Sequence, residues 1–497
     1  MRLLIPLVSL FLLLFACEVD RDYLTGDSVE LRFSVDTLTF DTVFTARGSA
    51  TRVFKVYNDA SDPVMIDRIH VAGETGVEFT FNADGTMGPE AEDVVIFGQD
   101  SIFVFVEVEV DPTQPSAVSP FVATDRLLFE TGNFQHEVTL EAYGQNAFYL
   151  NGFNRGTLVQ PICTDGTFTL PTDLPTVIYG SLVIDSCVLR VLAGSRIYFH
   201  GGLQRDNRPD GLGIFDDGFI YTFPSGRIEL LGTLEDPILL ATDRLEEDFT
   251  ESTGGYRGLI LGPESRGNRI EFTEIRNSII GVTVDSLAEV SLVNTRITNS
   301  SRSAVLSYQG DVTARNSLFH SSQSSTLQFI KGGNLLLEHC TLANYGSTDP
   351  ALSLSNCAPV PDQDYCLQAP LRTTVRNSII AGGSPAEIEL FDVDGRQNAA
   401  TFDVRILNSV VRTDQRFLSS QGNLYEDFYS TICEGCYNLE GGDPLFQSIR
   451  DDKYVPDSLS VARNLGIYLP DLPVDLEGND RDTESPDAGA LEWQPAG

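Results

Sequence analysis

Leu292-Val-Asn-Thr-Arg-Ile-Thr-Asn299 carries a short motif that returns several times along the chain. Its further copies are Ala314–Ser321, Leu337–Asn344, Val375–Ala381 and Ile406–Val411. The aligned polar column of these copies consists of Asn294, Asn316, His339, Asn377 and Asn408, with successive steps of 22, 23, 38 and 31 residues. Short β-rich repeats with a near-constant period, lengthened where a loop is inserted, are typical of a solenoid.

Within one repeat, strand-like runs alternate with short turns. Val290 and Leu292 point to one side of a strand, because side chains alternate between its two faces. Asn294 then occupies a bend, Ile297 returns to the interior, and Ala304–Tyr308 forms a further strand before the circuit closes. Two or three short strands per coil, stacked about 4.8 Å apart, predict a parallel β-helix. We expect the amides of the polar column to stack in the bends and hydrogen-bond from coil to coil, which is a structural role.

The repeat length of about 22 residues resembles that of right-handed parallel β-helices of the pectin-lyase-like superfold. We place this β-helix at residues 179–442, preceded by a connector and N-terminal cap at residues 147–178. The resemblance implies a fold and not an activity, because one fold hosts many unrelated functions.

Residues 31–146 show a different pattern, with alternating β runs such as Arg52–Tyr57 and Ser101–Val110. Their spacing predicts an immunoglobulin-like β-sandwich. Thr39-Phe-Asp-Thr-Val43, Val56-Tyr-Asn58 and Leu140-Glu-Ala-Tyr-Gly-Gln145 resemble Hydin-like sandwich domains of bacterial surface lipoproteins. That resemblance implies a spacer or adhesion module. The expected fold is therefore all-β, an immunoglobulin-like sandwich followed by a right-handed parallel β-helix.

The first residues have the form of a secretory signal peptide. Arg2 precedes an apolar run from Leu3 to Phe15, which is too short for a comfortable membrane span. Leu14-Phe-Ala-Cys17 resembles the lipobox of bacterial lipoproteins, which implies cleavage after residue 16 and a diacylated Cys17 as lipid anchor. Residues 1–17 are then the signal peptide and residues 18–30 an acidic tether. Their acidic residues resemble a tag for the outer face of the outer membrane, so the expected location is lipid-anchored at the cell surface.

The last segment, residues 443–497, breaks the period of the repeats. Gly442-Asp-Pro-Leu-Phe446, Asp475–Arg481 and Asp487–Trp493 resemble the closing segment of many bacterial surface β-helices. Because the end of a solenoid exposes backbone edges, we expect this segment to cap that end, with Trp493 as a plug. Sandwich, β-helix and tail together resemble uncharacterised outer-membrane lipoproteins with right-handed β-helix repeats.

The chain is strongly acidic, with 71 Asp and Glu against 33 Lys and Arg and a net charge of −38. Such a surface repels nucleic acid, anionic lipid and anionic polysaccharide unless a cation mediates. The charge fits either solubility or adaptation to a salty medium. The expected partners are the membrane, through the lipid, and polysaccharide or other envelope proteins; no nucleic acid is expected.

Beyond Cys17, seven cysteines remain. In an oxidising envelope compartment we expect disulfides, and the candidates are Cys163 with Cys187, Cys357 with Cys366, and Cys433 with Cys436. An alternative for the last four is a zinc site, although no second CxxC supports it. Cys340 is the odd cysteine and is expected to be a buried or turn thiol.

No catalytic constellation is recognisable in the sequence. Asp216-Asp217 and Asp451-Asp452 lack the companion motifs of galacturonan hydrolases, and no phosphate loop or Ser-His-Asp arrangement stands out. We predict no catalytic, cofactor-binding or metal site, with calcium at the acidic run Asp475–Asp482 as an alternative to a solvated turn. The predicted function is a structural or glycan- or partner-binding surface lipoprotein. The alternative is a carbohydrate-active enzyme, a polysaccharide lyase or glycoside hydrolase with an unrecognised site.

Overall fold

The computed structural model describes residues 23–24, 29–44, 51–73, 77–109, 121–151, 161–163, 165–206, 213–246, 249–363 and 365–495. The chain divides into two compact units, Met1–Asn146 and Ala147–Gly497. The predicted signal peptide, Cys17 and most of the predicted tether lie outside the described residues. Within those ranges, no helix is both long and apolar enough to cross a membrane.

The first unit consists of two five-stranded sheets that share one core. The strand orders are β1-β3-β8-β5-β6 and β2-β10-β9-β4-β7. The first sheet contains β1 (Leu31–Phe33), β3 (Arg52–Asn58), β8 (Asp100–Glu109), β5 (Glu78–Ala83) and β6 (Thr86–Met87), and the second contains β2 (Thr37–Phe44), β10 (Phe134–Gln145), β9 (Phe121–Thr131), β4 (Val64–Val71) and β7 (Glu90–Ile96).

Pairs of named strands within this unit are antiparallel except for β10 with β2. Side chains alternate as expected for strands with one buried face. In β8, Val104 and Val106 are fully buried, whereas Phe103 and Phe105 are exposed. The inner faces of both sheets contribute to one apolar cluster, which makes the unit a β-sandwich. Its predicted immunoglobulin-like character stays a prediction.

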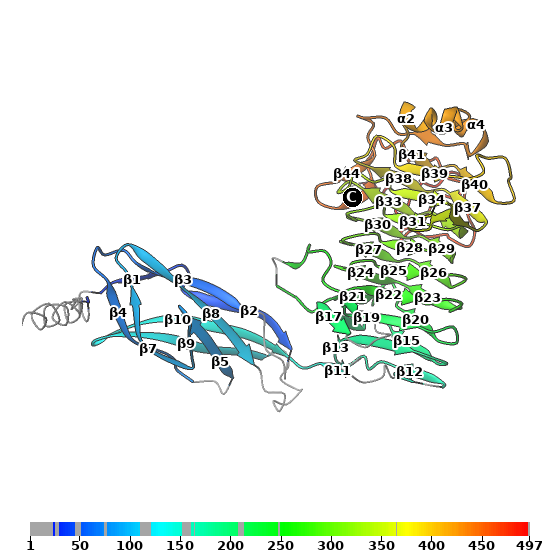
Figure 1. Ribbon diagram of the computed structural model, residues 1–497. Helices are drawn as coiled ribbons and strands as arrows, with labels where there is room; N and C mark the ends of the chain where they lie inside the picture. The colour runs from blue at the N-terminus through cyan, green and yellow to red at the C-terminus, as the bar shows by residue number, and fades with distance from the viewer. Residues whose placement is uncertain are drawn as a thin grey trace, which may run out of the picture. The chain divides into compact units, whose positions relative to one another are not determined.

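The second unit is a parallel β-helix built from three long sheets, as predicted (Figure 1). The eleven-stranded sheet contains β11 (Phe148–Asn151), β13 (Thr176–Tyr179), β16 (Arg196–His200), β21 (Ile238–Thr242), β24 (Thr273–Arg276), β27 (Arg296–Thr298), β30 (Leu318–His320), β33 (Thr341–Asn344), β38 (Ile379–Gly382), β41 (Val410–Val411) and β43 (Tyr437–Asn438). The ten-stranded sheet contains β12 (Thr167–Thr169), β15 (Val188–Leu192), β20 (Arg227–Leu231), β23 (Asn268–Glu271), β26 (Glu289–Val293), β29 (Asp311–Arg315), β32 (Gly333–Glu338), β37 (Leu371–Arg376), β40 (Phe402–Leu407) and β42 (Cys433–Glu434). The eight-stranded sheet contains β14 (Ser181–Ile184), β19 (Phe219–Thr222), β22 (Gly258–Leu261), β25 (Val282–Val284), β28 (Val305–Ser307), β31 (Leu327–Phe329), β34 (Leu352–Ser355) and β39 (Ile388–Phe391). Inward-pointing side chains of all three sheets fill the tube.

The β-helix begins earlier than the sequence predicted. Residues 147–178 were expected to form a connector and cap, but β11, β12 and β13 already pair in parallel with strands of the following coil. The prolines at positions 161, 171 and 175 interrupt this segment. Strands of three or four residues fit between such interruptions, so the first coil forms despite them.

The predicted polar column lies at the bend between the ten-stranded and the eleven-stranded sheet. Its five members, Asn294, Asn316, His339, Asn377 and Asn408, all have φ between 48° and 52°. This left-handed conformation is unfavourable for most side chains, and asparagine tolerates it best after glycine. The column therefore reflects a backbone requirement that recurs once per coil.

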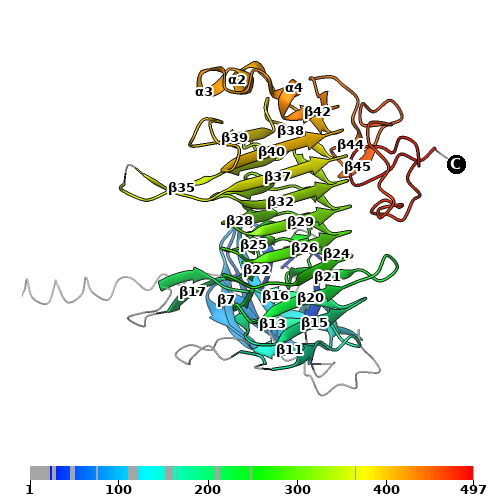
Figure 2. The ribbon, with the colours of Figure 1, turned by 90° about the vertical axis from the view of Figure 1, so that its right-hand side faces the viewer.

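The tail does not cap the end of the solenoid, so that prediction was wrong. The end is covered by the short helices α2 (Gln415–Leu418), α3 (Ser420–Asn423) and α4 (Phe428–Thr431), where Phe417, Tyr425 and Phe428 extend the apolar core. The tail, with β44 (Phe446–Ser448) and β45 (Lys453–Pro456), instead runs along the side of the solenoid (Figure 2). There it packs on outward-facing residues of the eleven-stranded sheet in a separate apolar cluster. Trp493 is half-buried in this tail, with the guanidinium of Arg463 3.9 Å from its ring centroid.

All six candidate cysteines are in disulfides. The bonds are Cys163–Cys187, Cys357–Cys366 and Cys433–Cys436, and Cys340 is free and buried. The four thiols of the alternative zinc site are therefore paired with one another. The Cys357–Cys366 bond closes the hairpin of β35 (Cys357–Pro359) and β36 (Cys366–Gln368), which projects from the solenoid (Figure 2).

Candidate functional site

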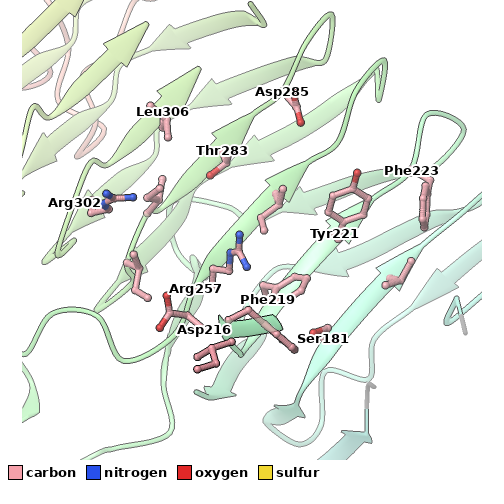
Figure 3. Close-up of a pocket in the computed structure, with 16 residues that line it drawn as sticks. Ser181, Asp216, Phe219, Tyr221, Phe223, Arg257, Thr283, Asp285, Arg302 and Leu306 are labelled. Carbon is pink, nitrogen blue, oxygen red and sulfur yellow. The ribbon is translucent and has the colours of Figure 1, made fainter. Parts of the chain in front are cut away.

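A pocket of about 840 Å³ lies on the outer face of the eight-stranded sheet. We call it the aromatic pocket. Its sixteen lining residues are Ser181, Val183, Ile214, Phe215, Asp216, Phe219, Tyr221, Phe223, Arg257, Ile260, Ile279, Ile280, Thr283, Asp285, Arg302 and Leu306. They come from five neighbouring strands, the turns beside them, and one hairpin (Figure 3).

The alternation of β19 supplies the aromatic side chains. Ile220 is buried in the tube, so Phe219 and Tyr221 point outward from the same strand. Phe223 follows the strand and is 41% exposed. Its ring lies 5.2 Å from that of Tyr221 in an edge-to-face arrangement. Tyr221 is in register with Ile260, so an apolar surface continues from the aromatic rings into the next coil.

A glycine lies beside these rings. Gly258 is in register with Phe219 and has a φ of 114°, a conformation that other residues rarely adopt. A Cβ atom there would lie 1.8 Å from the carbonyl oxygen of Ile280. Position 258 can therefore carry no side chain without a shift of the backbone, and neighbouring coils pack closely next to Phe219, which is 6% exposed.

A hairpin forms one wall of the pocket. It consists of β17 (Leu203–Asp206) and β18 (Gly213–Asp216), and the Phe215 ring packs edge-to-face on Phe219 at 6.4 Å. The base of the hairpin is fixed at Asp217. The Ser181 hydroxyl donates to its carboxylate at 3.2 Å, and the Arg257 backbone N–H donates to its carbonyl oxygen at 3.1 Å. Burial raises the pKa of Asp217, while hydrogen bonds from Gly218 and Ser181 oppose that rise.

Four charged side chains line the same pocket. The Arg257 guanidinium lies 5.3 Å from the ring centroid of Phe219. Arg302 is exposed at the pocket edge, and Asp216 and Asp285 supply carboxylates. Burial, and secondarily the charge of Asp285, raises the pKa of Tyr221, so its phenol remains a hydrogen-bond donor at neutral pH. Flat apolar faces beside hydrogen-bond donors and acceptors are suited to a ligand with both apolar and polar surfaces.

The pocket was not predicted from the sequence. Asp216 was noted only as part of an acidic pair, and the aromatic residues were missed. The signal was present in Phe219-Ile-Tyr-Thr-Phe223, where aromatic residues occupy every second position and so share one face of a strand.

The polar column lies elsewhere on the solenoid, and no member of it lines the aromatic pocket. The side chains of two of its members, Asn316 and Asn377, hydrogen-bond to the tail. Asn316 donates to the Val474 carbonyl at 2.7 Å and accepts from Arg481 at 2.8 Å. Among the described residues, one hydrogen bond joins side chains of the column from coil to coil, between Asn377 and His339 at 2.9 Å. The expected continuous ladder of amides is therefore replaced by contacts with residues far along the chain.

The acidic run of the tail has structural contacts of its own. The buried Asp475 carboxylate accepts hydrogen bonds from backbone N–H groups of Glu477, Asn479 and Glu492. Glu477 forms an ion pair with Arg296 at 2.8 Å. Across the described part of the chain, no cluster of three or more His, Cys, Asp or Glu side chains has the geometry to hold a metal ion. Calcium at this run stays an untested alternative.

No protein-family model matches the chain, and no curated protein matches it. Among solved structures, it is similar to a family 123 glycoside hydrolase from Clostridium perfringens, described for glycolipid glycan hydrolysis. That match has 7% identity and a TM-score of 0.16, and it covers 46% of this chain and 62% of the hydrolase.

Two further matches are structures of the catalytic domain of a family 87 α-1,3-glucanase in complex with nigerose. The first, of a variant, has 8% identity, a TM-score of 0.16, and coverage of 74% of this chain and 81% of that domain. The second has 10% identity, a TM-score of 0.14, and coverage of 72% and 90%. At such TM-scores these similarities carry no argument about function, which must rest on the aromatic pocket itself.

Proposed function

We propose that this protein binds a glycan in the aromatic pocket and holds it at the bacterial envelope through a lipid on Cys17. The observation that carries the proposal is the lining of one outer face by Phe219, Tyr221 and Phe223 beside charged side chains of both signs. The C–H faces of a sugar ring pack on aromatic rings, while its hydroxyl groups donate to carboxylates and accept from guanidinium groups. The lipid anchor is supported by the Leu14-Phe-Ala-Cys17 motif.

A second candidate function is glycoside hydrolysis in the same pocket. Asp216 on the hairpin and Asp285 beyond β25 both line it. Most glycosidases use two carboxyl groups that flank the sugar as catalytic residues, one acting as acid and the other as base or nucleophile. Under this alternative, Asp216→Asn and Asp285→Asn each abolish hydrolysis of the glycan while its binding is retained.

The binding proposal is tested with the purified mature chain and a panel of bacterial and algal oligosaccharides. We expect Tyr221→Ala to weaken binding of any oligosaccharide that the wild type binds by about tenfold, equivalent to about 1.4 kcal/mol. Phe105→Ala is the matched control, because Phe105 is a 44% exposed aromatic residue in the other unit. Equal affinities for wild type and Tyr221→Ala would contradict the proposal. Reducing-sugar release measured in the same samples decides between binding alone and hydrolysis.

A further inference from the structure

The aromatic pocket contains two arginines without carboxylate partners. No ion pair among the described residues includes Arg257 or Arg302. Many arginines elsewhere pair closely, for example Arg190 with Glu229 at 2.7 Å, whereas Arg196, Arg266 and Arg372 also form no ion pair among the described residues. Carboxylates are in excess in a chain with 71 acidic and 33 basic residues, and Arg257 and Arg302 are the two arginines that line the aromatic pocket.

These two arginines occupy the same edge of the pocket. Arg257 precedes β22 and Arg302 precedes β28, two coils further along. The backbone joins them through the coil between, since Ile280 N–H donates to the Arg257 carbonyl and Arg302 N–H donates to the Ile279 carbonyl. Two coil steps of about 4.8 Å separate their backbones by roughly 10 Å. Figure 3 shows Arg257 between Arg302 and the rings of Phe219 and Tyr221, with Asp216 on the same side as the arginines and Asp285 on the other.

The formal charge of the pocket lining also differs from that of the whole chain. Its lining carries two arginines and two aspartates, a formal sum of zero, whereas the chain carries −38. The Arg257 guanidinium is held over the Phe219 ring at 5.3 Å, so it faces the same space as the aromatic surface. An anionic group that is repelled elsewhere on the surface can therefore be accommodated at this edge.

We infer that the aromatic pocket selects an acidic glycan, with carboxylate or sulfate groups spaced to meet Arg257 and Arg302. This inference rests on the proposed function and names the class of ligand for the same site. Guanidinium groups bind carboxylate and sulfate oxygens through paired N–H donors. Their backbone separation is close to that of alternate sugars in an extended chain, so the fitting ligand carries an acidic group on every second sugar. The aromatic rings contact the sugar faces between these groups.

The test measures affinity by calorimetry for two matched pairs of oligosaccharides. One pair is a uronate-containing oligosaccharide and its carboxyl-reduced form, and the other is a sulfated oligosaccharide and its desulfated form. We expect Arg257→Gln and Arg302→Gln each to weaken binding of the acidic form at least tenfold and to change binding of the neutral form less than twofold. Arg372→Gln is the matched control, because Arg372 is exposed on the ten-stranded sheet outside the pocket. Whichever acidic pair shows the effect identifies the anionic group.

The outcomes separate the inference from the function on which it rests. If neutral and acidic forms bind equally well, and Tyr221→Ala weakens both, the glycan-binding function stands and the selection of acidic glycans is wrong. The inference is also overturned if Arg257→Gln, Arg302→Gln and Arg372→Gln have equal effects. If Tyr221→Ala changes no affinity, the proposed function itself fails. Melting curves of each variant verify that the fold is intact.

Discussion

Replacing Asn316 with leucine measures how strongly the tail is attached to the solenoid. Asn316 is buried, has a φ of 51°, and its side chain bonds to Arg481 and to the Val474 carbonyl in the tail. Asn294 has the same φ of 51°, but its side-chain oxygen is buried without a partner. Leucine therefore meets the same backbone strain at both positions, about 1–2 kcal/mol. Only Asn316→Leu also loses contacts with the tail.

The size of the difference follows from these contacts. Asn316→Leu removes one acceptor of Arg481 Nη2, which keeps the Gly489 and Ala490 carbonyls, and it leaves the Val474 carbonyl without its side-chain donor. Each buried group that loses its partner costs about 1–3 kcal/mol. We expect Asn316→Leu to destabilise the tail by about 1–3 kcal/mol more than Asn294→Leu does.

The only tryptophan of the chain reports on this region directly. Trp493 lies in the tail, so its fluorescence during urea titration follows detachment of the tail separately from unfolding of the coils. We expect a lower midpoint for Asn316→Leu than for Asn294→Leu. Identical midpoints would refute the conclusion that the polar column holds the tail.

Three further outcomes are expected. Burial raises the pKa of Glu387 to about 7 despite N–H bonds from Ser384 and Ala351. Since this folded-state pKa lies above the usual value near 4.5, the group favours folding when protonated, and its contribution falls as pH rises from about 4.5 to 7. Glu387→Gln should therefore gain melting temperature relative to wild type between pH 5 and pH 8, and a constant difference would contradict this. Cys17→Ala should release the protein from membranes. A mutant that stays wholly membrane-bound on fractionation would contradict the prediction of a lipid anchor on Cys17. Raising sodium chloride from 0.1 to 1 M should raise the melting temperature, because the Debye length falls from about 10 to 3 Å and repulsion within a chain of net charge −38 is screened. A melting temperature that does not change would show that the carboxylates are well dispersed. A larger effect of calcium at equal ionic strength would indicate a bound cation.

The sequence by itself was sufficient to predict the repeating coil of the β-helix. A left-handed bend is needed once per turn of the solenoid, and asparagine satisfies it locally, so Asn294, Asn316 and Asn377 mark the period without any knowledge of the fold. The alternation of apolar residues in runs such as Val290–Leu292 likewise specifies which face is inside, because strand periodicity is a local property. These two signals were sufficient to predict a parallel β-helix and the approximate position of its strands.

Only the tertiary structure decided what happens on the outside of the tube. Arg481 meets Asn316 across 165 residues, and no local pattern specifies which outer face a distant segment will cover. The aromatic pocket depends in the same way on register between coils, which places Gly258 beside Phe219 and brings Arg257 and Arg302 to one edge. A strand pattern shows that a side chain points outward. Whether it then meets the tail, a neighbouring coil or a ligand depends on long-range packing, because the outer faces of a solenoid carry no periodic requirement of their own.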